Sequence, residues 1–168
     1  MAETTRPQAI TAGIGIRMLA SGYDMLILIG VLFLTFIPVT MAEQAWGTID
    51  QWLKGLLIIT IAYAYFVGFW VNGGATTGMR PWKLQVAMNA SGNPLSVLAA
   101  TTRFAALMLT WLALGMTLIY MMHRDTNHLL FFISALLPAF SLLVMMLTRE
   151  RQSLHDLISG TAVYRLSK

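Results

Sequence analysis

Four long apolar stretches, separated by shorter polar segments, are the main pattern of this chain. They predict membrane-spanning helices over about residues 17–40, 52–71, 97–122 and 129–147. A helix rises about 1.5 Å per residue, so about 20 apolar residues cross a hydrocarbon core of roughly 30 Å. Each stretch is long enough to do so, which indicates a polytopic membrane protein.

The polar segments predict smaller elements. Residues 1–12 form a polar N-terminal tail, and residues 148–168 form a C-terminal segment outside the membrane. Within the latter, a short interfacial helix is expected from Leu154, because its apolar residues share one face. Alternation over 83–88 and β-forming residues over 161–166 predict two short strands. These two strands are candidates for a small sheet at the membrane surface.

Composition supports the membrane assignment. The chain is 57% hydrophobic and only 11% charged, whereas soluble domains carry about 25% charged residues. We therefore expect a single all-α membrane domain over 1–168, with the lipid bilayer as its environment. Its predicted fold is a four-transmembrane-helix bundle with a small cytoplasmic β-hairpin or sheet.

The distribution of basic residues predicts the orientation. An even number of spans places both termini and the 72–96 loop on one side of the membrane. Cytoplasmic segments are enriched in Lys and Arg, so we expect both termini in the cytoplasm. Of the 11 basic residues, Lys54 and Arg124 fall on the other side, and the rest are Arg6, Arg17, Arg80, Lys83, Arg103, Arg149, Arg151, Arg165 and Lys168.

Charge and residue counts exclude several functions. The net charge of +4 is explained by this cytoplasmic enrichment, so we expect no nucleic-acid partner. With no cysteine, disulfides and thiolate metal sites are excluded. His123, His128 and His155 are too scattered to predict a metal site. Because no nucleophile–base pair or cofactor motif is visible, we expect a non-enzymatic protein without a cofactor.

Arg17 and Asp24 are the candidate functional residues of the first span. They are seven residues apart, so they share a helix face but lie about 10 Å from each other. Each is therefore expected to pair with a residue of another segment: Asp24 with Arg103, and Arg17 with Asp156. Arg17 alone is also consistent with a basic side chain reaching the interface. Asp24 is either a protonatable functional site or a charge that fixes helix register.

Asp156 lies beyond the fourth span and has more than one interpretation. Ser153 and Asp156 match the S-x-x-D capping-box pattern at a helix start. Pairing with Arg17 at the same interface is the second interpretation, and a direct role in transport is the third. His155 and Arg151 adjoin Asp156 and are secondary candidates.

Four fragments together resemble the arginine–aspartate–aspartate, or RDD, family of bacterial membrane proteins. They are RMLASGYD in the first span, GATTGMRPWKLQV after the second, TTRF at the third, and RQSLHDLISGTAVY near the end. The resemblance covers residues from about 10 to 164. It places the family's arginine on Arg17 and its two aspartates on Asp24 and Asp156. Gly78 and Arg80 are further secondary candidates, because many members have a lysine directly after a glycine, whereas Gly78 here is followed by Met79 and then by Arg80.

The resemblance implies a multi-pass protein of the bacterial cytoplasmic (inner) membrane. It also implies a role in transport of unidentified ligands or in cation exchange. On this hypothesis Asp24 is the protonatable site of a small carrier, which is expected to be a homo-oligomer. The alternative is an accessory or scaffold subunit of a larger membrane complex, in which the Arg/Asp residues are structural.

Overall fold

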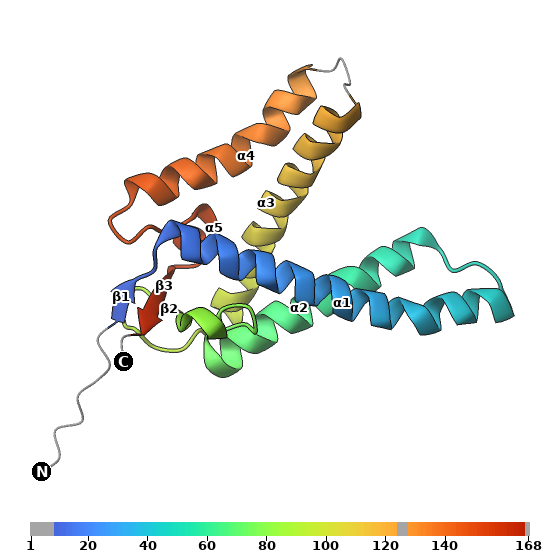
Figure 1. Ribbon diagram of the computed structural model, residues 1–168, viewed down its shortest axis with the longest axis horizontal. Helices are drawn as coiled ribbons and strands as arrows, with labels where there is room; N and C mark the ends of the chain where they lie inside the picture. The colour runs from blue at the N-terminus through green and yellow to red at the C-terminus, as the bar shows by residue number, and fades with distance from the viewer. Residues whose placement is uncertain (1–8, 124–127, 167–168) are drawn as a thin grey trace, which may run out of the picture.

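The computed structural model describes residues 9–123 and 128–166, and four long helices make up most of this part of the chain (Figure 1). They are α1 (Ile14–Trp46), α2 (Gln51–Gly73), α3 (Val97–His123) and α4 (His128–Leu147). All four are long and apolar enough to cross a membrane. The predicted all-α membrane fold with four spans is therefore confirmed.

The helix α1 is longer than the predicted span of residues 17–40. It contains 33 residues and continues through Pro38 to Trp46. A proline inside a helix removes one hydrogen bond and bends the helix, but neighbouring turns can continue it. The end comes at Gly47, whose φ of 100° lies in the region that favours glycine.

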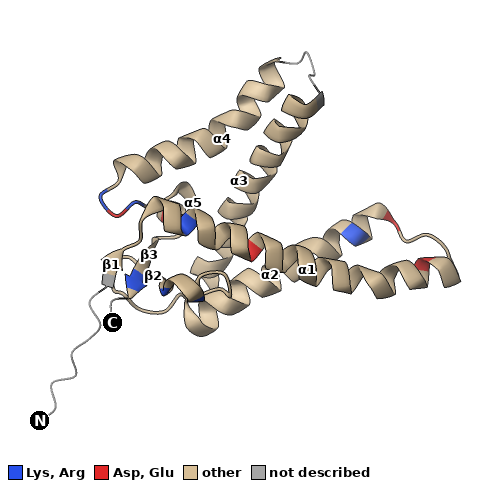
Figure 2. Cartoon of the chain, viewed as in Figure 1, with Lys and Arg blue, Asp and Glu red and all other residues tan. Residues whose placement is uncertain are grey.

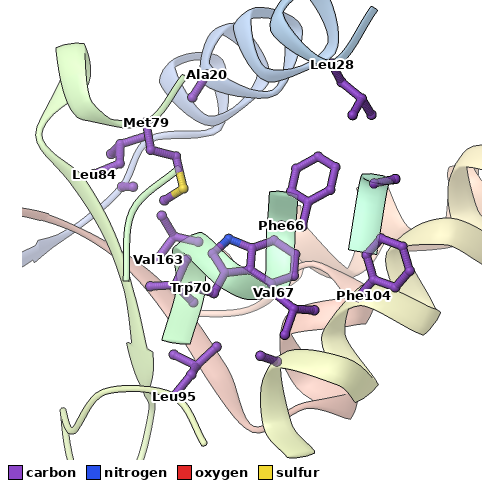
Figure 3. Close-up of a cluster of buried hydrophobic side chains, with 14 residues drawn as sticks. Ala20, Leu28, Phe66, Val67, Trp70, Met79, Leu84, Leu95, Phe104 and Val163 are labelled. Atoms are coloured by element: carbon purple, nitrogen blue, oxygen red, sulfur yellow. The ribbon is translucent and has the colours of Figure 1, made fainter. Parts of the chain in front are cut away.

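The helices form two hairpins, α1–α2 and α3–α4, which diverge from a common base (Figure 1). The hairpins are joined where α2 packs against α3. Figure 3 shows the apolar core at this junction, where Phe66 and Trp70 of α2 meet Phe104 of α3. The Phe66 ring centre lies 5.3 Å from that of Trp70 and 6.3 Å from that of Phe104. This aromatic packing fixes the base on which the polar residues are built.

A small antiparallel sheet and two short helices complete the base. The strands are β1 (Ala9–Thr11), β2 (Leu84–Met88) and β3 (Thr161–Leu166), in the order β1-β3-β2. The short helices are η1 (Arg80–Trp82) and α5 (Leu154–Ile158).

The sheet confirms both predicted strands and adds one. Val86 of β2 pairs with Val163 of β3. The added strand β1 lies in the segment predicted to be a polar tail, and its Ile10 pairs with Arg165. Three residues are too few to show an alternating pattern, so β1 depends on the neighbouring strand rather than on a local signal.

Charged residues gather at the base and at the far end of the α1–α2 hairpin (Figure 2). Because β1 and β3 pair, the two ends of the described chain also lie together at the base. This agrees with an even number of spans. The assignment of the base to the cytoplasm stays a prediction, and it rests partly on Arg6, Arg124 and Lys168, which lie outside the described residues.

Candidate functional site

A buried carboxylate, Asp156, binds two arginines from different helices. Asp156 belongs to α5 and is fully buried, with 0% of its surface exposed. It accepts a hydrogen bond and forms an ion pair with Arg17 of α1 and, through its other oxygen, with Arg103 of α3. We call Arg17, Arg103 and Asp156 the Asp156 cluster. The predicted Arg17–Asp156 pair is confirmed, and the cluster joins α1, α3 and the C-terminal segment.

Asp156 also closes the start of α5. The backbone N–H of Ser153 donates a hydrogen bond to Asp156 Oδ2 at 2.8 Å, and the Ser153 hydroxyl donates to the same oxygen at 2.7 Å. These contacts complete the predicted capping box. Burial alone would raise the pKa of Asp156, but the charges of Arg103 and Arg17 hold that pKa below its ordinary value. The carboxylate therefore stays ionised. Capping and ion pairing, which the sequence left as alternatives, occur together.

Both arginines have further partners inside the protein. Arg103 donates to the Thr161 hydroxyl at 2.5 Å, and its guanidinium lies 4.9 Å from the centre of the Trp70 ring. Arg17 donates to the backbone oxygen of Arg151. The contribution of Arg151 is thus a carbonyl, while its side chain is exposed. Because only 8% of Arg17 is exposed, this side chain points into the protein rather than along the membrane surface.

His155 lies beside the Asp156 cluster but is uncharged at neutral pH. Its Nε2 lies 2.9 Å from the Ser153 hydroxyl and 3.8 Å from an Asp156 oxygen. Burial lowers the pKa of His155 to about 3, although the negative charge of Asp156 acts in the opposite direction and raises it. His155 therefore adds polarity to the site without adding positive charge.

This partly buried histidine predicts a loss of stability in acid. Unfolding returns the pKa of His155 from about 3 to its ordinary 6.5, so the unfolded chain binds one more proton between these values. Stability therefore falls as pH drops below 6.5. We expect His155→Gln to weaken this dependence, measured by unfolding in detergent from pH 7 to pH 4. The control is His128→Gln at an exposed position. An unchanged pH dependence in His155→Gln would show that another group is responsible.

Asp24 lies apart from the Asp156 cluster, and its predicted pairing with Arg103 is wrong. Its carboxylate accepts hydrogen bonds from the Tyr65 hydroxyl at 2.7 Å, the Thr76 hydroxyl at 2.5 Å and the Gly78 backbone N–H at 2.9 Å. Among the described residues no ion pair involves Asp24. Arg103 pairs with Asp156 instead, and Asp24 faces α2 and the loop that follows it.

The hydrogen bonds of Asp24 hold the loop after α2 directly against α1. A Cβ added to Gly78 would lie 2.6 Å from the Ala20 backbone oxygen and 2.7 Å from the Asp24 nitrogen. Only glycine permits this approach, which explains why the sequence carries it here. Arg80, the other secondary candidate in this loop, is exposed and lies 5.5 Å from the centre of the Phe69 ring. It belongs neither to the Asp156 cluster nor to the surroundings of Asp24.

Sequence reasoning missed three hydroxyl partners. Tyr65 and Thr76 donate to Asp24, and Thr161 accepts from Arg103. Tyr65 carried a usable signal, because a phenol within an apolar span needs a hydrogen-bond partner when it is buried. The two threonines lie in loop or strand segments, where a hydroxyl is common and gives no comparable signal.

The two hairpins border a partly open cavity of about 460 Å³. Its polar wall includes Arg17, Asp24, Arg103, Ser153 and His155. The remaining walls are mainly apolar and come from α1, α2, α3 and α4, with Leu107, Trp111, Leu114, Leu142 and Met145 among them. We call this space the inter-hairpin cavity. It brings the arginines of the Asp156 cluster and the separate Asp24 to one space between the membrane-spanning helices.

These features define a multi-pass α-helical membrane protein with a buried arginine–aspartate cluster at the base of its spans. The model of the RDD family matches residues 11–160. The chain therefore belongs to the RDD family. No curated protein and no solved structure matches the chain. Within the described residues, no group of three or more histidine or acidic side chains is arranged to hold a metal ion.

Proposed function

We propose that this membrane protein is a transporter that moves a small solute or exchanges a cation for protons through the inter-hairpin cavity. The observation that carries the proposal is the position of that cavity, which lies between membrane-spanning helices and has ionisable side chains on its wall. A volume of about 460 Å³ is in the range of small-molecule sites, roughly 300–1,000 Å³.

Asp24 is the proposed protonatable residue. It lines the cavity and only 4% of it is exposed, and it is the one carboxylate among the described residues on the cavity wall. An acidic side chain inside a span is costly and often marks an ion or proton pathway. Its three protein donors fix the carboxylate toward α2 and the following loop. Protonation would place a hydrogen on one carboxyl oxygen and remove the negative charge, which would weaken the hydrogen bonds that hold this loop. This would couple the proton to the cavity wall.

A second candidate function is an accessory subunit of a membrane complex. It is favoured by the observation that both aspartates already have protein partners and join separate segments of the chain. In this case the polar groups maintain the fold and the apolar helices provide lateral contacts. The protein would then have no flux of its own, and we propose no enzymatic role for either candidate.

Flux in proteoliposomes distinguishes the two functions. We expect a proton gradient to drive Na⁺ or K⁺ exchange, read with a pH-sensitive dye. Gly22→Phe should reduce the flux to the level of protein-free liposomes, because Gly22 lines the cavity and has free space at its Cβ position. Gly30→Phe is the matched control on the same helix, since it also has free space but does not line the cavity.

A second pair of variants tests the carboxylate itself. Asp24→Asn should abolish the exchange, and Asp50→Asn, at an exposed position without a side-chain cap, should preserve it. Unfolding temperatures of all variants are measured in parallel. An absence of flux in wild-type protein, together with lower stability of Asp24→Asn, would favour the accessory role instead.

A further inference from the structure

The base of the inter-hairpin cavity carries more positive than negative charge. Arg17 and Arg103 are 8% and 4% exposed, yet they share a single carboxylate, that of Asp156. His155 is neutral at pH 7 because burial lowers its pKa to about 3. Asp24 adds a negative charge farther along α1, about 10 Å from Arg17, and its three donors there are uncharged. An uncompensated buried charge is strongly unfavourable, so this end of the cavity favours an anion.

The donor groups at this end are also not saturated. The Nε of Arg103 and the Nε1 of Trp70 are buried and have no hydrogen-bond acceptor among the described residues. Both residues line the cavity. Native proteins rarely leave buried donors without a partner, because each donor then loses its hydrogen bond to water without a replacement. Because neither atom reaches the cavity surface, the case for an anion rests on the charge surplus of the Asp156 cluster.

The cavity extends from this polar end into an apolar region. Along α3 its wall runs from Arg103 to Leu114, a distance of about 16 Å at the rise of a helix. This is about half of a hydrocarbon core of roughly 30 Å. Beyond Arg103 the wall is mainly apolar and includes Leu107, Leu114 and Leu142. The cavity thus has the polarity and depth of a single membrane leaflet.

The cavity opens sideways between α1 and α4. These two helices do not pack closely, whereas α3 packs on α4 and α1 on α2. Met18 of α1 and Leu142 of α4 line the cavity and remain 59% and 47% exposed. Both residues lie on membrane-spanning helices. In a bilayer the neighbours of this opening are therefore acyl chains rather than water.

We propose that the inter-hairpin cavity binds an anionic lipid taken from the leaflet on the side of the sheet. Its headgroup phosphate lies against Arg17 and Arg103 and supplies the missing anion. An acyl chain follows α3 and α4 along the apolar wall. The proposal does not depend on ion flux, because the charge surplus and the sideways opening exist whether or not a solute crosses.

Quenching of tryptophan fluorescence tests this binding directly. Trp111 lines the apolar part of the cavity, so a brominated acyl chain bound there should quench it. The protein is placed in nanodiscs of phosphatidylcholine with a minor fraction of brominated lipid, either phosphatidylglycerol or phosphatidylcholine. The signal of Trp111 is obtained by subtracting that of Trp111→Phe. We expect the site to prefer brominated phosphatidylglycerol over brominated phosphatidylcholine roughly fivefold. This factor corresponds to about 1 kcal/mol of attraction between one basic residue and an anionic lipid.

Two glycine variants control the measurement. Gly22→Phe should remove the preference for phosphatidylglycerol, because Gly22 lines the cavity one helical turn after Met18 and a phenyl ring there would take up space at the opening. Gly30→Phe should keep it, since Gly30 does not line the cavity. Both variants leave the Asp156 cluster unchanged, so a loss of preference does not result from breaking its ion pairs. Equal quenching by both lipids in wild-type protein, or a preference that survives in Gly22→Phe, would overturn the proposal.

Free anions and flux provide the remaining distinctions. Inorganic phosphate should not compete with brominated phosphatidylglycerol, because it gains nothing from the apolar wall; full competition would mean that the site takes a soluble anion and would overturn the lipid assignment. Lipid preference without ion exchange in wild-type protein would reject the proposed transport function alone. Ion exchange without lipid preference would reject the lipid site alone.

Discussion

Replacing Asp156 by asparagine is expected to reduce the free energy of unfolding by about 3–5 kcal/mol. This is the usual cost of removing one partner of a buried ion pair, because the other charge stays buried without compensation. The substitution would leave Arg17 and Arg103 buried without their shared carboxylate. It would also weaken the capping box with Ser153. Because the cluster joins α1, α3 and α5, the loss should be global. Unfolding of purified protein in detergent measures it.

The matched control is Asp50→Asn, which changes the same chemical group at an exposed position in the α1–α2 loop. Surface substitutions of this kind usually change stability by less than about 0.5 kcal/mol. If Asp156→Asn behaved like this control, the cluster would not hold the base together.

Gly78→Ala is expected to be the second severe change. The new methyl group would lie 2.6 Å from the Ala20 backbone oxygen and 2.7 Å from an Asp24 carboxylate oxygen. Both atoms are held by α1, so the loop would have to move away and lose its hydrogen bond to Asp24. Overpacking of this kind costs about 1–3 kcal/mol, and the lost hydrogen bond adds to it.

Gly73→Ala provides the comparison for this prediction. Gly73 is the last residue of α2, and a Cβ added there meets no atom within 4 Å. We expect it to unfold at the wild-type temperature, whereas Gly78→Ala should unfold well below it. Equal unfolding temperatures for the two variants would show that the loop does not rest on α1 as described.

Much of the fold followed from the sequence because its signals are local. Four apolar stretches predicted four helices, and the Ser153–Asp156 spacing predicted the capping box. The Arg17–Asp156 pair was also predictable, since both residues were expected at the same end of the spans. The β1 strand could not be predicted in this way, because it forms only by pairing with β3, which lies over 150 residues away.

The partner of Asp24 was predicted wrongly for a geometric reason. The pairing with Arg103 assumed a closed bundle in which α1 and α3 touch at the same depth. The inter-hairpin cavity is instead lined by both helices, and Asp24 is directed to Tyr65 and Thr76. The bounds of an apolar stretch indicate how deep in the membrane a charged residue lies. The direction in which its side chain faces depends instead on how the hairpins are arranged.

Proton-driven Na⁺ or K⁺ exchange by the Gly22→Phe and Gly30→Phe proteins in proteoliposomes tests most directly whether the inter-hairpin cavity is the working site. With both variants folded, we predict that Gly22→Phe shows only the leak of protein-free liposomes and that Gly30→Phe exchanges ions like the wild type. Exchange at the wild-type rate in Gly22→Phe would contradict a route through this cavity.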